Sequence, residues 1–206
     1  MSSENPSILS KTQLRDRLRA QRATLDASVH LAVISALMSV LANNALFKNA
    51  QHIACYCAQG SELSLQSIIE FIWQTQKKCY LPVLSTQDDR SLCFVSYQAG
   101  DSLLPNRYGI LEPVFLPEKV LAPEKLDLVF LPLVGFNQAG HRLGSGSGYY
   151  DRTFAFLSHD SHASKPFLMG VGFQEQFCEY LPHDEWDVCL DAMVTQQGIT
   201  FFDKLK

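Results

Sequence analysis

The stretch LDLVFLPLVGFNQAGHRLGSGSGYYD, residues 126–151, joins a continuous apolar run to a loop with three glycines. The apolar run, 126–136, is typical of a parallel strand that is buried on both faces of a sheet. The residues that follow the glycines, 149–158, have a helical pattern. A strand, a glycine loop and a helix in this order indicate an open α/β sheet, in which ligands bind beyond the carboxyl ends of the strands.

The rest of the chain alternates in the same way. Ser10 is a candidate N-cap for a helix over 11–25, and a largely buried helix is expected over 28–44. The expected strands lie over 52–58, 78–84, 92–97 and 167–173, the other helices over 64–76 and 174–181, a loop-rich passage around 105–123, and a closing strand pair within 191–202. This pattern predicts an α/β sheet with one or two N-terminal helices packed against it.

Composition narrows the class of protein. The 206 residues fit a single domain, 1–206, and the net charge of −4 lacks the basic surplus typical of nucleic-acid binding. The N-terminus has no apolar signal-peptide core, and the run 126–136 is too short for a membrane span, so we expect a cytoplasmic protein with no membrane partner. The six cysteines form no C-x-x-C pair, which favours reduced core residues over a disulfide frame or a zinc site.

The glycine loop has two interpretations. Gly144, Gly146 and Gly148 permit positive φ and let backbone N–H groups converge on an anion, but a flexible turn explains them equally well. The loop lacks the lysine of a Walker A motif and the third glycine of the G-x-G-x-x-G fingerprint. Arg142 and Asp151 favour phosphate binding, because an arginine can fork onto phosphate oxygens and an aspartate can hold Mg²⁺. Asp151 also suits the first turn of a helix without any ligand.

A row of basic residues follows one face of the predicted N-terminal helix: Lys11, Arg15, Arg19 and Arg22. Like charges at this spacing repel one another by roughly a few tenths of a kcal/mol per pair. Such a row usually forms a solvated face. A bound polyphosphate would turn the repulsion into a binding site, provided that the helix reaches the glycine loop.

Three further positions are candidates with ordinary alternatives. Glu62 stands between a predicted strand and a predicted helix, where sheets present functional side chains and where acids also begin helices. Tyr108 suits stacking on a planar ligand or simply filling a loop. Asp184, Asp187 and Asp191 include a candidate second metal ligand, although acids in such a segment are commonly on the surface. No Ser/His/Asp order or Cys/His pair indicates a nucleophilic site.

Taken together, these features resemble the 5-formyltetrahydrofolate cyclo-ligase family, also called methenyltetrahydrofolate synthetases. The resemblance spans nearly the whole chain, through KTQLR (11–15), GSELSLQSII (60–69), YGILEP (108–113), the block 126–152 and LPHDEWDVCLDAMVT (181–195). Its most specific part is the pattern F-x-x-x-G-x-R-L-G-x-G-x-G-Y-Y-D-R over 136–152.

The resemblance implies a fold and a reaction. The implied fold is a three-layer Rossmann-like, mostly parallel sheet flanked by helices, with a basic N-terminal helix. The implied enzyme uses ATP and Mg²⁺ to convert 5-formyltetrahydrofolate to 5,10-methenyltetrahydrofolate, releasing ADP and phosphate. Apart from the resemblance, we expect no nucleic-acid or membrane partner and a monomer. The γ-phosphoryl group would pass to the formyl oxygen, because an amide oxygen is a poor leaving group. N10 would then attack the carbon, and phosphate would depart.

The resemblance also implies roles for single residues. Lys11 and Arg15 match the family's N-terminal phosphate contacts, and Asp151 and Asp191 its magnesium ligands. The rest of the implied ATP site comprises Arg142, Leu143, Gly144, Ser145, Gly146, Ser147, Gly148, Tyr149 and Tyr150. The implied substrate contacts are Cys57, Glu62, Tyr108 and Tyr150, with Glu62 on the pterin. Arg142 and Tyr150 would be catalytic, Tyr150 by polarising the formyl oxygen.

Two other functions share these features. A folate- or nucleotide-binding relative without turnover would keep the same contacts and act as a reservoir or sensor. A different ATP-dependent phosphotransferase would keep the glycine loop and have no need of an aromatic wall at Tyr108.

Overall fold

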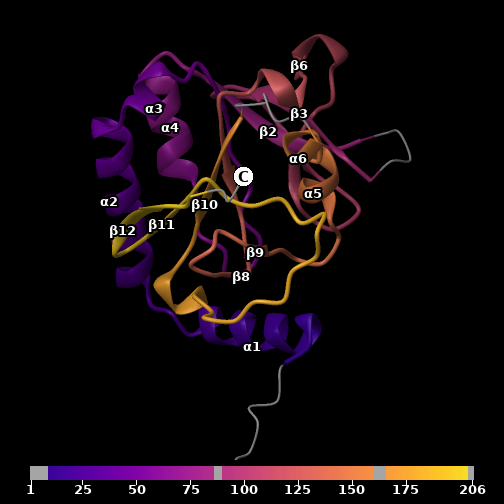
Figure 1. Cartoon of the computed structure of the whole chain (residues 1–206). Helices are drawn as coiled ribbons and strands as arrows, with labels where there is room; N and C mark the ends of the chain where they lie inside the picture. Colours follow the sequence, from indigo (N-terminus) through magenta and orange to yellow (C-terminus); the bar gives the residue numbers. More distant parts are fainter. Residues whose placement is uncertain (1–8, 86–89, 160–165, 204–206) are drawn as a thin grey trace, which may run out of the picture.

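The computed structural model describes residues 9–85, 90–159 and 166–203, and an eight-stranded sheet forms its centre (Figure 1). The strand order is β12-β11-β10-β7-β1-β2-β3-β6, parallel from β11 to β2 and antiparallel at both edges. The strands are β1 (His52–Ala54), β2 (Lys78–Leu84), β3 (Leu92–Tyr97), β6 (Val120–Leu121), β7 (Leu128–Leu131), β10 (Phe167–Val171), β11 (Ala192–Thr195) and β12 (Gly198–Phe201). The predicted mostly parallel α/β sheet is confirmed.

Helices cover both faces of this sheet (Figure 1). They are α1 (Lys11–Ala23), α2 (Ala27–Asn43), α3 (Ala45–Asn49), α4 (Gln66–Gln74), α5 (Tyr149–Thr153) and α6 (Phe156–His159), with 3₁₀ turns at Pro117–Lys119, Pro123–Lys125 and Gln174–Gln176. α2, α3 and α4 lie on one face and α5 and α6 on the other, which makes the three layers. Within the described ranges no single helix is long and apolar enough to cross a membrane; α1 and α2 meet those criteria only together, across a 99° bend.

The run 126–136 forms two strands instead of the single one that its apolar pattern predicted. β7 lies between β1 and β10 and is buried at all four positions. It ends at Leu131, because Pro132 has no N–H for the ladder. The chain then turns out of the sheet, and β8 (Gly135–Phe136) pairs with β9 (Arg142–Leu143) in a separate hairpin. This hairpin carries the first residues of the glycine loop.

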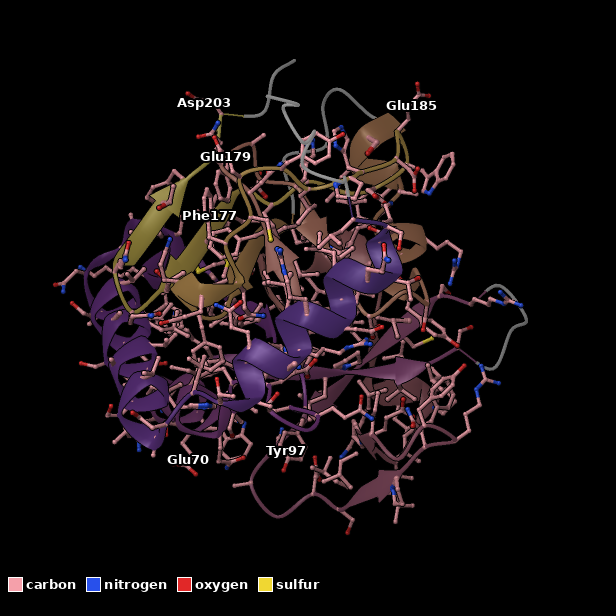
Figure 2. The ribbon with its side chains drawn as sticks, turned by 90° about the horizontal axis from the view of Figure 1, so that it is seen from below. Glu70, Tyr97, Phe177, Glu179, Glu185 and Asp203 are labelled. Carbon is pink, nitrogen blue, oxygen red and sulfur yellow. The ribbon has the colours of Figure 1, made fainter. Side chains whose placement is uncertain are left out.

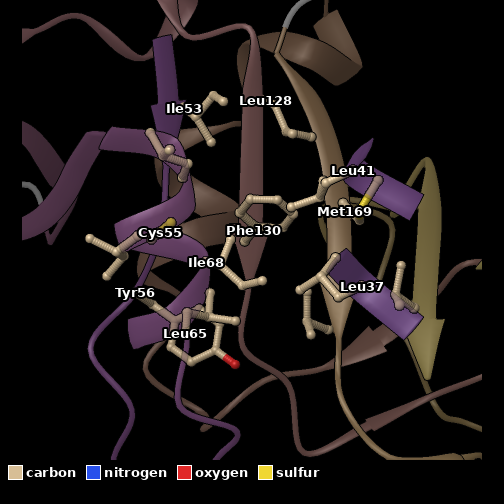
Figure 3. Packing of buried hydrophobic residues seen from close by; sticks show 14 of the residues in the cluster. Leu37, Leu41, Ile53, Cys55, Tyr56, Leu65, Ile68, Leu128, Phe130 and Met169 are labelled. Atoms are coloured by element: carbon tan, nitrogen blue, oxygen red, sulfur yellow. The ribbon is translucent and has the colours of Figure 1, made fainter. Parts of the chain in front are cut away.

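Alternate side chains of β7 pack into the two halves of the core. Leu128 and Phe130 face the α2 and α4 side, and Val129 and Leu131 face the α5 side. Figure 3 shows Phe130 in contact range of side chains from the neighbouring strands and helices. Burying an aromatic side chain of this size stabilises the fold by roughly 1.5–3 kcal/mol.

Three other expected elements are shorter or broken. β1 ends at Ala54 rather than at residue 58, so Cys55–Cys57 leave the sheet at its carboxyl end. The helix expected over 149–158 is split into α5 and α6. The helix expected over 174–181 is only a 3₁₀ turn, because Phe177 and Cys178 pair with the backbone of Phe136 instead. The loop-rich passage contains a hairpin of β4 (Leu103–Pro105) and β5 (Leu111–Pro113) that was not predicted.

α1 lies across the carboxyl end of the parallel strands, where Figure 2 shows it in front of the sheet. Ser10 caps it as predicted, with a reciprocal pair of bonds to Gln13. Leu14 and Leu18 pack on a small cluster of their own that includes Leu143 beside the glycine loop. The fold therefore brings the basic N-terminal helix to the loop.

Candidate active site

A cleft of about 800 Å³ opens at the carboxyl end of the sheet. β2, the next strand of the sheet after β1 in the sequence, lies on one side of β1, and β7 lies on its other side. The strand order therefore reverses between β1 and β7. The cleft lies at this reversal, lined by residues that follow β1 and β7 together with β2, α1, the β4–β5 hairpin, the glycine loop, α5 and the segment 184–187. Ligands of open α/β sheets bind at such a point.

The glycine loop needs its glycines at two positions. Gly146 has φ +110° and Gly148 has φ +67°, which L side chains rarely adopt. A Cβ on Gly148 would also lie 2.8 Å from Nη1 of Arg152, whose Nη2 donates to the Ser147 carbonyl oxygen (2.5 Å). At these two positions the loop therefore has a backbone conformation that favours glycine.

α1 contacts this loop directly. Nε of Arg15 donates to the Gly144 carbonyl oxygen (2.9 Å), and Nη2 of Arg19 donates to that of Ser145 (3.2 Å). Burial, together with the charge of Arg19, lowers the pKa of Arg15. Lys11 and Arg15 both line the cleft. These two residues of the basic row are therefore part of the cleft, and an anion bound there would relieve the repulsion.

Arg142 is the most buried charged group of the cleft, with 6% of its surface exposed. Its Nη2 donates to Oδ1 of Asp151 (2.6 Å), and its guanidinium lies 5.7 Å from the ring centre of Tyr150. Within the described residues its Nε is buried and has no hydrogen-bond partner. Buried donors are nearly always satisfied, so this N–H indicates a ligand acceptor such as a phosphate oxygen.

Acidic residues of the C-terminal segment complete this side of the cleft. Nζ of Lys11 contacts Oδ2 of Asp184 (2.5 Å) and Oδ2 of Asp187 (3.0 Å). Burial alone would lower the pKa of Lys11, but its bonds to these two carboxylates raise it. The Val188 N–H donates to Oδ1 of Asp151 (3.2 Å), so Asp151 lies next to this segment.

The structure corrects the expected pairing of Asp151 with Asp191. Asp191 stands just before β11, at the amino end of the sheet, and its Oδ2 accepts from the N–H of Leu168 at the start of β10 (2.7 Å). It does not line the cleft, whereas Asp151 and Asp187 do. Asp191 therefore connects two parallel strands at the opposite end of the sheet, while Asp184 of the same segment lines the cleft as well.

Glu62 and Tyr150 form the inner part of the site. Oε2 of Glu62 accepts from the Gln59 N–H (3.0 Å), and burial raises the pKa of Glu62 despite that bond. Glu62 itself is not a lining residue, but Cys57, Gln59 and Tyr150 are. Burial, and then the charge of Glu62, raises the pKa of Tyr150, so its phenol keeps its proton. Burial likewise raises the pKa of Cys57 to about 11, so the thiol is a contact rather than a nucleophile.

The β4–β5 hairpin supplies an aromatic wall. Tyr108 at its tip is 50% exposed and packs edge-to-face on Tyr149, with ring centres 6.4 Å apart. Gln59 Nε2 donates to the Tyr108 carbonyl oxygen (3.2 Å), and Arg107 Nη2 donates to the Tyr149 hydroxyl (2.9 Å). These contacts hold the hairpin against the segment that follows β1 and against the start of α5, next to the glycine loop.

Several cleft residues were not predicted as site residues. Glu112 lines the cleft with its Oε1 accepting from the Leu84 N–H (3.1 Å) and from Asn106 Nδ2 (2.6 Å). Asp187 was only one of three candidate acids, and Glu112 stood inside YGILEP without a signal of its own. The other predicted contacts, except Glu62 and Asp191, all line this one cleft.

Comparisons with known proteins point to one group. The chain matches the model of the 5-formyltetrahydrofolate cyclo-ligase family over residues 7–196. It is 36% identical over 182 residues to the 5-formyltetrahydrofolate cyclo-ligase of Haemophilus influenzae, covering 87% of this chain and 94% of that one. The Escherichia coli protein of the same name is 38% identical over 150 residues, with 73% and 80% covered. The NMR structure of Aquifex aeolicus 5,10-methenyltetrahydrofolate synthetase superposes with a TM-score of 0.77 at 26% identity, covering 96% of this chain and 94% of that one.

Proposed function

This chain belongs to the 5-formyltetrahydrofolate cyclo-ligase family, and we propose that the cleft at the carboxyl end of its sheet is where the reaction takes place. The enzyme uses ATP to convert 5-formyltetrahydrofolate to 5,10-methenyltetrahydrofolate. The strongest support for the site is the Arg142 guanidinium, which is buried at the cleft and has one N–H without a partner among the described residues. A transferring phosphoryl group supplies the acceptor that this N–H lacks.

The phosphate groups of ATP are proposed to lie against the glycine loop. The loop offers backbone around Gly146 and Gly148, and Lys11, Arg15 and Arg142 supply positive charge from both sides. Catalysis of phosphoryl transfer rests mainly on positioning and on charges placed before the reaction begins. The contacts of α1 with the loop carbonyls provide this order.

Asp151 and Asp187 are proposed to hold a magnesium ion. Within residues 9–85, 90–159 and 166–203, no group of three or more His, Cys, Asp or Glu side chains is arranged to hold a metal ion. Mg²⁺ is commonly held by one or two carboxylates together with phosphate oxygens, and these two aspartates fit that donor set beside the phosphate-binding residues. When bound with ATP, the ion supplies charge neutralisation to the phosphate oxygens.

The reaction itself is proposed to proceed in two steps. The formyl oxygen attacks the γ-phosphorus, the bond from that phosphorus to the bridging oxygen breaks, and ADP leaves. N10 then attacks the activated carbon, the C–O bond breaks, and phosphate departs with the proton from N10. Tyr150 lies between the glycine loop and Glu62, where its protonated hydroxyl can donate to the formyl oxygen.

The folate is proposed to occupy the inner end of the cleft. The amino and amide N–H groups on the pterin edge match a carboxylate such as Glu62. Tyr108 provides a half-exposed ring for stacking, and Cys57 provides a neutral contact. A phosphotransferase for a small sugar would leave this aromatic wall unused.

One optical assay tests the proposed function. Mixing the protein with Mg-ATP and 5-formyltetrahydrofolate is expected to produce the absorbance of the methenyl cation together with one ADP per turnover. EDTA is expected to abolish both signals, and excess Mg²⁺ to restore them, because the ion neutralises the charge of the phosphate oxygens during transfer. Folate binding without any product would identify a non-catalytic binding protein, and ADP formation without the methenyl band would identify a different phosphotransferase.

Substitution of Glu62 tests the folate end. Glu62→Gln keeps the shape of the side chain but removes its charge, so the KM for 5-formyltetrahydrofolate is expected to rise roughly ten- to a hundredfold, the range for a hydrogen bond to a charged group. The KM for ATP is expected to change little. Steady-state kinetics in both substrates measure this, with Glu70→Gln on the exposed face of α4 as the control (Figure 2). An unchanged folate KM would remove Glu62 from the binding site.

A further inference from the structure

Arg22, in the last turn of α1, is a buried arginine that does not line the cleft. Only 7% of its surface is exposed. Its Nη1 donates to the Leu133 carbonyl oxygen (3.2 Å), and its Nε donates to the Ser61 hydroxyl (3.1 Å). Leu133 follows β7 and Ser61 follows β1, so one guanidinium joins α1 to both loops behind the cleft. Burial lowers the pKa of Arg22, because removing the guanidinium charge from water costs free energy.

The same guanidinium faces Glu62 without bonding to it. Nη1 of Arg22 lies 4.0 Å from Oε1 of Glu62, beyond hydrogen-bond distance. Oε2 of Glu62 is already taken by the Gln59 N–H, and Oε1 has no hydrogen-bond partner within the described part of the chain. The bonds to Leu133 and Ser61 keep Arg22 at this distance. Glu62 therefore has a cationic neighbour and one open carboxylate oxygen.

We propose that Arg22 is a positioning residue that keeps Glu62 ionised and oriented while leaving one carboxylate oxygen open for the pterin. The proposal rests on the proposed role of Glu62 in folate binding. A forked Arg–carboxylate ion pair would occupy both oxygens and compete with the substrate. An arginine anchored elsewhere, 4.0 Å away, supplies charge and takes neither oxygen.

The surroundings of Glu62 show why a positive charge is needed. Burial raises the pKa of Glu62, and the Gln59 N–H and the charge of Arg22 act against that rise. The groups that face Glu62 are Arg19 and Arg22 of α1, Tyr56 after β1 and Tyr150 of α5. Without Arg22 the carboxyl group would take up a proton at higher pH, and a protonated Glu62 is a poorer acceptor for the pterin N–H groups.

The same helix also contacts the other substrate's site. Lys11 and Arg15, in the first two turns of α1, line the cleft beside the glycine loop, while Arg22 lies at the other end of the helix. The apolar contacts of Leu14 and Leu18 lie between them. Because α1 is anchored at three places, Arg22 is held independently of whether folate is bound.

The test is a pH series of the folate KM in Arg22→Gln. We expect the KM to rise about tenfold near neutral pH, with little change in kcat or in the KM for ATP, because the charge that keeps Glu62 ionised and oriented is lost. Affinity requires ionised Glu62, so it is lost as the pH falls through the pKa of that group. Loss of Arg22 raises this pKa further. The acidic limb of the pH profile, where the folate KM rises as the pH falls, is therefore expected to move up by about one pH unit. Arg22→Lys keeps the charge and is expected to return the limb toward that of the wild type.

A double-mutant cycle with Glu62→Gln separates this proposal from the proposed function. The effect of Arg22→Gln is expected to disappear in the Glu62→Gln background. If Glu62→Gln raises the folate KM while a folded Arg22→Gln leaves both the KM and the acidic limb unchanged, Arg22 has no positioning role. Equal effects in both backgrounds would likewise overturn it. If Glu62→Gln itself has no effect, the proposed role of Glu62 fails instead.

Two further variants guard against a purely structural effect. Arg17→Gln, on the exposed side of the same helix, is expected to leave every kinetic parameter unchanged. Ser61→Ala removes one anchor of Arg22 and no charge, and is expected to raise the folate KM a few-fold and only when Glu62 is present. Should Arg22→Gln fail to fold, this variant decides: an unchanged folate KM in Ser61→Ala would overturn the proposal.

Discussion

Replacement of Asp151 by asparagine is expected to lower kcat by about a hundred- to a thousandfold, the range seen when one electrostatic contact of a transition state is removed. Asparagine is a neutral and weak ligand for Mg²⁺, and it leaves the buried charge of Arg142 unbalanced beside the phosphate groups. The amide oxygen can still accept from Arg142 Nη2 and from the Val188 N–H, the two contacts that Asp151 makes. The fold is therefore expected to survive, with a loss of about 1–2 kcal/mol.

Rates at saturating substrates and thermal melts measure the two effects of Asp151→Asn separately. The same exchange at Asp203, an exposed aspartate (Figure 2), controls for the loss of one negative charge. Raising the Mg²⁺ concentration is expected to recover part of the rate, because a weakened site fills at higher metal concentration. Near-normal turnover in a folded Asp151→Asn would remove Asp151 from the mechanism and from the proposed magnesium site.

Local sequence patterns predicted the elements whose formation depends on residues close together in the sequence. A continuous apolar run predicted β7 in the middle of the sheet, and Ser10 predicted the start of α1. The end of β7 was missed because the apolar pattern continues past Pro132, whereas the ladder does not. The 174–181 segment was wrongly expected to be helical, because a bridge to Phe136 outweighed its weak helical preference.

Contacts between distant parts of the chain were beyond the reach of sequence patterns. Asp187 and Asp191 are four residues apart with no local sign of which faces the cleft. Asp191 directly precedes β11, so it lies at the amino end of the parallel strands and away from the cleft. Arg22 and Ser61 are 39 positions apart, and Arg15 and Gly144 are 129 apart. Only the fold shows that Lys11 and Arg15, at one end of the basic row, lie beside the glycine loop. It also shows that Arg22, at the other end, lies near Glu62.

Tyr150→Phe is expected to lower kcat by about a hundredfold with little change in either KM, because the hydrogen-bond donor to the oxygen that gains negative charge as the C–O bond breaks is lost. Within the described residues the Tyr150 hydroxyl has no hydrogen-bond partner, so its removal breaks nothing in the free enzyme. The ring keeps its stacking on Phe154, with centres 6.3 Å apart, and stays over Arg142. Thermal stability is therefore expected to be unchanged or slightly higher.

This combination distinguishes a catalytic hydroxyl from a packing residue. A packing role predicts a loss of stability with a modest loss of activity, whereas a donor to the formyl oxygen predicts the reverse. In a single turnover the methenyl absorbance is expected to slow while ADP formation keeps its rate, because the formyl oxygen gains negative charge only when the C–O bond breaks, after ADP has formed. Tyr180→Phe, at a side chain that is 66% exposed and outside the cleft, is the matched control. If ADP formation and the methenyl band slowed equally in a single turnover of Tyr150→Phe, Tyr150 would act on the phosphoryl transfer instead of on the departure of phosphate.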